Sequence, residues 1–76
     1  MDDAQRRAHA GMLLSDPVFV EIMDDLERTA INRLLAAPAK DHEGRLAAAT
    51  EANAIRAVRS RLTALTEQPQ KKRAAA

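Results

Sequence analysis

The side chains of this sequence that could do chemistry are acids and histidines at short spacings. Asp41, His42 and Glu43 are consecutive, and carboxylates and imidazoles are common ligands of zinc. Successive residues of a helix point about 100° apart, so these three side chains do not converge on one ion. We interpret Asp41 as a helix N-cap instead, and the same argument excludes Asp24 with Asp25 as a paired site.

Nucleophilic catalysis would need a thiol or hydroxyl beside a base, in a cleft that excludes water. The sequence has no cysteine, its Ser and Thr residues are isolated, and its two histidines, His9 and His42, are far apart. A small helical chain also seldom forms such a cleft. We therefore expect a non-enzymatic protein with no catalytic residue, metal, cofactor or small-molecule substrate.

Basic residues suggest a different chemistry, which is contact with phosphates. Arginines on one side of the expected last helix, and a basic cluster near the C-terminus, resemble short nucleic-acid-binding patches. The candidate contacts are Arg45, Arg56, Arg59, Lys71, Lys72 and Arg73. Nearby acids at Glu43, Glu51 and Glu67, and the lack of stacking aromatic residues, favour a solvated surface instead. Both interpretations stay open.

Helices must position these side chains, and the clearest helix is predicted over residues 17–37. Asp16 can accept a backbone N–H at its start, and Pro17 suits its first position. Apolar residues then recur every three or four positions, which places them on one stripe. They are Phe19, Ile22, Met23, Leu26, Ala30 and Leu34. Pro38 ends the helix because it lacks an N–H and crowds the preceding turn.

Two further helices are predicted, over residues 2–14 and 42–67. The turn at 36–41 is short, which favours antiparallel neighbours, so 17–37 and 42–67 should form a helical hairpin preceded by a short helix. The last helix carries an apolar seam for this contact. The seam is Ala47, Ala48, Ile55, Val58, Leu62 and Leu65. Residues 68–76 form a short basic tail with no reason to fold by itself.

The chain has more apolar side chains than one hairpin needs. The expected core packs Phe19, Ile22, Leu26 and Leu34 on Ile55, Val58, Leu62 and Leu65. Four residues outside this core are the predicted partner interface, namely Val18, Val20, Ile31 and Leu35. They favour contact with a second copy or with another protein.

Composition places the chain in the all-α class as one small domain over residues 1–67. Alanine is the commonest of the 76 residues, aromatic residues are nearly absent, and no cysteine can staple the fold. The N-terminus lacks the basic and apolar parts of a secretory signal, and no apolar run is long enough for a membrane span. We therefore expect a cytoplasmic protein with no membrane contact.

The two halves of the chain carry opposite charge. Residues 1–37 have four Arg and seven acids, giving −3, whereas residues 38–76 have eight Lys and Arg and four acids, giving +4. This distribution suits antiparallel packing of one half on the other, or ordered contact between copies.

Three segments of the sequence resemble a known group of proteins. They are LLSDPVFVEIMDDLERTAINRLL, then DHEGR after a short turn, and IRAVRSRLTAL at the end of the last helix. The pattern is similar to small helical proteins encoded among the head and DNA-packaging genes of tailed bacteriophages and prophages, and covers roughly residues 8–65. In this pattern Asp41 and Arg45 open the last helix, where their spacing suits a structural ion pair.

The resemblance implies a virion head, connector or packaging accessory, present in the bacterial host cytoplasm during assembly or in the virion. Its expected partners are itself or a larger phage structural protein. The alternative is a small DNA-binding accessory or regulator that uses the arginines and the tail. An inhibitor that fills a groove on a host enzyme is physically allowed, but no residue favours it.

Overall fold

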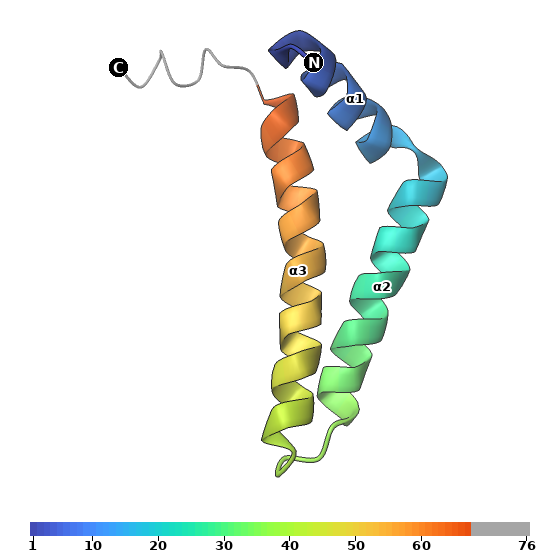
Figure 1. The fold of residues 1–76 in the computed structure, drawn as a ribbon. Coiled ribbons are helices and arrows are strands. Elements are labelled where there is room, and N and C mark those ends of the chain that lie inside the picture. Colours follow the sequence, from blue (N-terminus) through green and yellow to red (C-terminus); the bar gives the residue numbers. More distant parts are fainter. Residues whose placement is uncertain (68–76) are drawn as a thin grey trace.

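The computed structural model describes residues 1–67, which form three helices and no strand. The helices are α1 (Asp3–Ser15), α2 (Pro17–Ala36) and α3 (His42–Thr66), as Figure 1 shows. The all-α prediction is confirmed for this part of the chain. The predicted helix ends at 2–14, 17–37 and 42–67 differ from the observed ends by at most one residue. The predicted basic tail at 68–76 lies outside the described residues.

An aspartate caps the N-terminus of each helix. The carboxylate of Asp2 caps α1, that of Asp41 caps α3, and that of Asp16 accepts the N–H groups of Val18 and Phe19 at 2.8 and 3.1 Å. Each bond satisfies a backbone donor that has no partner within the helix. Because Asp16 also ends α1, this one residue sets both the break and the start of α2.

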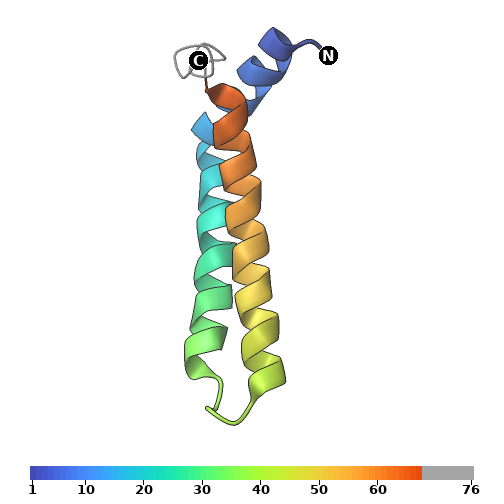
Figure 2. The ribbon, with the colours of Figure 1, turned by 90° about the vertical axis from the view of Figure 1, so that its left-hand side faces the viewer.

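The chain doubles back on itself at residues 37–41. α2 runs toward this turn and α3 runs back beside it, in the opposite direction (Figure 1). α1 packs against both of them at the end where α2 begins. Figure 2 views the molecule edge-on and shows that α1 leans out to one side of the plane of α2 and α3. The two sides of that plane therefore differ in shape.

The core between the helices is built mostly from alanine. Within the described residues, the buried apolar side chains are Ala10, Met23, Ala30, Ala48, Ala52 and Ile55. No large side chain in that part of the chain is fully buried. Small side chains let helices approach closely, but they remove little apolar area from water.

Part of the predicted core was wrong. Ile22, Leu26 and Val58 are 50%, 46% and 47% exposed. The reason is the width of the apolar stripe: α2 contacts α3 along the line of Met23 and Ala30, and the other side chains lie to one side of that line. Phe19, Leu34, Leu62 and Leu65 are half-buried. The helix pair therefore leaves large apolar side chains partly in water.

Candidate protein-binding face

The four predicted interface residues do not share one surface. Val18, Val20 and Leu35 are 64%, 38% and 76% exposed, whereas Ile31 is half-buried. Val18 and Val20 are two residues apart, which is about 200° of rotation around a helix, so they point to opposite sides of α2. Val18 therefore does not lie on the same surface as Val20, and whether the four residues bind a partner stays a prediction.

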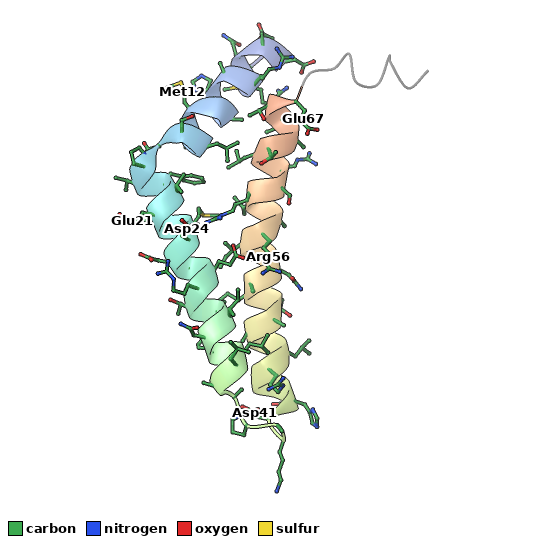
Figure 3. The ribbon with its side chains drawn as sticks, turned by 180° about the vertical axis from the view of Figure 1, so that it is seen from behind. Met12, Glu21, Asp24, Asp41, Arg56 and Glu67 are labelled. Atoms are coloured by element: carbon green, nitrogen blue, oxygen red, sulfur yellow. The ribbon has the colours of Figure 1, made fainter. Side chains whose placement is uncertain are left out.

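Ion pairs cover one side of the hairpin plane, which we call the ion-paired side. Arg56 Nε donates to Glu27 Oε2 at 2.8 Å, and Arg59 Nη2 donates to Asp24. Figure 3 labels Asp24 on α2 and Arg56 on α3. Arg59 Nη1 also lies 3.9 Å from Glu27 Oε1. These bonds tie α2 to α3 across 29 and 35 positions of sequence. Two of the predicted nucleic-acid contacts are therefore engaged within the molecule.

Arg45 is engaged at the turn. Its Nη1 donates to the backbone oxygens of Leu34 and Ala37, both at 3.4 Å. These oxygens belong to the last turn and C-cap of α2, where carbonyls lack helical partners. The expected pairing with Asp41 is not what the structure shows, because the Asp41 carboxylate accepts the N–H of Gly44 instead. Lys71, Lys72 and Arg73 lie outside the described residues.

The other side of the hairpin carries large apolar side chains, and we call it the open face. Residues seven apart on a helix point in nearly the same direction. Phe19 and Leu26 are therefore on one side of α2, and Glu51 and Val58 are on one side of α3. Arg33 follows Leu26 by seven residues and forms an ion pair with Glu51 at 2.6 Å. These two sides of α2 and α3 therefore lie next to each other.

An apolar groove lies in the open face below α1. It has a volume of about 570 Å³. Its walls are Leu13 from α1, Phe19 from α2, and Ala57, Val58, Arg61 and Leu62 from α3. Ile22 and Leu26 are half-exposed on the turns of α2 that follow Phe19. Large apolar side chains from all three helices thus gather at one place.

A second depression, the alanine hollow, lies near the turn. Its volume is about 470 Å³. It is lined by Arg33, Ala36, Ala37, Asp41, Gly44, Ala47, Ala48 and Glu51. Gly44 precedes Glu51 by seven residues, so the hollow and the groove are on the same side of α3. A Cβ at Gly44 would lie 2.2 Å from the Asp41 carboxylate, so glycine leaves room for this cap.

Within residues 1–67, no three His, Asp or Glu side chains come close enough together to hold a metal ion. None of the helices in the same range has the length and apolarity to cross a membrane. No protein-family model, curated protein or solved structure was found to match the chain.

The residues of the open face that the sequence prediction missed are Leu13, Ile22, Leu26 and Val58. The last three were assigned to the core because their spacing is helical. A sequence signal distinguishes Leu26 and Val58 from core residues. Leu26 is seven residues from Arg33, and Val58 is seven residues from Glu51, so each points to the same side of its helix as a charged residue. A charged pair on the same side of the helices as apolar side chains indicates that contact between α2 and α3 does not bury this side.

Proposed function

We propose that this protein is a non-enzymatic assembly component, an antiparallel helical hairpin that completes its apolar core against another protein chain. The observation that supports it is the burial pattern. Within residues 1–67 no large side chain is fully buried. Leu13 and Val58 line one apolar groove and are partly exposed, as are Ile22 and Leu26 on the same open face. Exposed apolar patches of this kind mark protein-binding surfaces.

The size of the apolar core determines how much hydrophobic burial stabilises the fold. Complete burial of a Val, Leu or Ile side chain is worth about 1.5–3 kcal/mol, so three side chains left half in water forgo a few kcal/mol. That amount is a large share of the roughly 5–15 kcal/mol that stabilises a folded domain. A partner chain that covers the open face would supply this free energy.

The resemblance in residues 8–65 supports the biological setting of the proposal. In that setting the protein is a head, connector or packaging accessory of a tailed bacteriophage, present in the cytoplasm of the bacterial host during assembly. Its partner is a second copy of the chain or a larger virion protein. Mass spectrometry of purified virions and head-assembly intermediates should detect the chain, and its absence from both would contradict this setting.

Sedimentation equilibrium of the full chain tests the assembly function. We expect the average mass to rise above that of one chain between about 1 and 100 µM, which corresponds to an association free energy near −7 kcal/mol. A monomer at every concentration that also unfolds cooperatively and binds no phage head protein would contradict the proposal.

A further inference from the structure

We infer that a second copy of this chain docks on the open face, reversed end for end, with α1 of each copy seated in the alanine hollow of the other. The inference rests on the proposed assembly function and names its partner and its geometry. The dimer would have two-fold symmetry, so each copy contributes the same surface.

The shape of the open face supports this arrangement. α1 leans out on one side of the hairpin at one end, as Figure 2 shows. Its residue Leu13 lines the groove of the open face, and the alanine hollow lies on that same face near the turn. Two copies placed face to face in the same direction would bring both α1 helices into one space. In the reversed arrangement, each α1 meets the hollow of the other copy.

Met12 of α1 is the side chain that would fill the hollow. Ala10 of α1 is buried, and Met12, about 200° further round the helix, is 67% exposed. Figure 3 shows Met12 on the side of α1 away from α3. Methionine is flexible and fills irregular apolar gaps. Five of the eight residues that line the hollow are alanine or glycine, beside the charged Arg33, Asp41 and Glu51. The chain thus carries both a projecting apolar side chain and a depression with small walls.

Two charged residues of α3 also favour a second copy as the partner. Glu43 and Arg61 are 18 residues apart on α3, which is about five turns, so they lie on the same edge of that helix at opposite ends. Both are exposed, and neither one forms an ion pair with a residue in the range 1–67. In a reversed dimer, Glu43 of each copy faces Arg61 of the other. An unrelated partner would need to provide both charges at this distance, whereas a second copy has them already.

Chemical cross-linking tests the geometry, because the natural chain has no cysteine. The variant with Glu43→Cys and Arg61→Cys places its two thiols about 27 Å apart along one helix, too far for a link within a chain. A short thiol-specific reagent should therefore give closed covalent dimers. The single variants, Glu43→Cys or Arg61→Cys alone, should stay monomeric after the same treatment.

Two other outcomes would overturn the inference without affecting the assembly function. One is a ladder of larger oligomers from the double variant, which would show a head-to-tail arrangement. The other is no cross-link from a protein that sedimentation shows to be dimeric. A chain that is monomeric in sedimentation would overturn the second-copy inference, and the assembly function would then depend on its binding to a head protein.

Two further sets of variants test the inference independently, one by exchanging charges and one by filling the hollow. Arg61→Glu should weaken dimerisation about tenfold, since two exposed ion pairs per dimer are replaced by repulsion, and adding Glu43→Arg should restore it. Ala47→Phe, in the hollow, should abolish dimerisation with no loss of helix content, whereas Ala64→Phe, at an exposed site outside it, should not. Unchanged association in Arg61→Glu and Ala47→Phe would overturn the inference.

Discussion

At the scale of single residues, aspartates and alanines have separate roles in the fold. The aspartates at positions 2, 16 and 41 stop and start the helices by accepting backbone N–H groups. Alanines such as Ala30 and Ala48 let the helices lie close together. The caps at Asp16 and Asp41 were predicted from the sequence and are confirmed, because capping depends on neighbouring residues alone.

The cap at Asp16 gives a direct prediction. Asp16→Ala leaves the N–H groups of Val18 and Phe19 without their acceptor, so the free energy of unfolding should fall by about 1 kcal/mol. Urea denaturation followed by circular dichroism measures it. Asp16→Ser is the control, because serine can cap the same helix, and an equal loss in both variants would contradict the role of the cap.

The close approach of α2 and α3 gives a second prediction. Ala30 is 0% exposed, so Ala30→Leu adds methylene groups where there is no space and should lower the free energy of unfolding by about 1–3 kcal/mol. Ala8→Leu makes the same change at an exposed helical position and should have little effect. Equal stability of the two variants would show that the helices are not closely packed at Ala30.

At the scale of helices, the ion pairs set how α2 and α3 align. Arg56 and Arg59 meet Glu27 and Asp24 because the short turn at 37–41 fixes which residues lie opposite each other. The sequence predicted the helices and the turn, since these depend on local spacing. It did not predict these partners, because pairing over 29 or more positions depends on the register.

A double-mutant cycle on Glu27 and Arg56 measures this alignment. Glu27 is 20% exposed and Arg56 is 59% exposed, so we expect a coupling free energy of only about 0.5–1 kcal/mol, smaller at high salt. Zero coupling at low salt would contradict the pairing. The cycle of Glu27 with Arg28, which pairs with Asp25 instead, is the control.

The difference between the two sides of the hairpin is also a property of the helices. Leu26, on the open face, is less exposed than Leu35, which lies away from it. We nevertheless expect Leu26→Ser to weaken self-association at least tenfold, because this side chain becomes buried in the complex, and Leu35→Ser to leave it unchanged. Sedimentation equilibrium of both variants measures their self-association. A larger loss in Leu35→Ser than in Leu26→Ser would contradict the assignment of the open face.

At the scale of the whole molecule, the number of helices followed from the sequence but the closure of the core did not. Helical spacing predicts which apolar residues lie on the same side of a helix, and Ile22, Leu26 and Val58 have that spacing. How much of that side a neighbouring helix covers depends on the line of contact, which small residues such as Ala30 and Ala48 determine. The open face could therefore be recognised only with all three helices in place.

Completion of the apolar core by a second copy of the chain is tested most directly by thermal unfolding at different concentrations of the protein. If a second copy covers the open face, mass action stabilises the folded dimer, and Tm should rise by about 3–5 °C for each tenfold increase in protein concentration. A cooperative transition with the same Tm at every concentration would show a protein that is stable as a monomer, and would contradict completion of the core by a second copy.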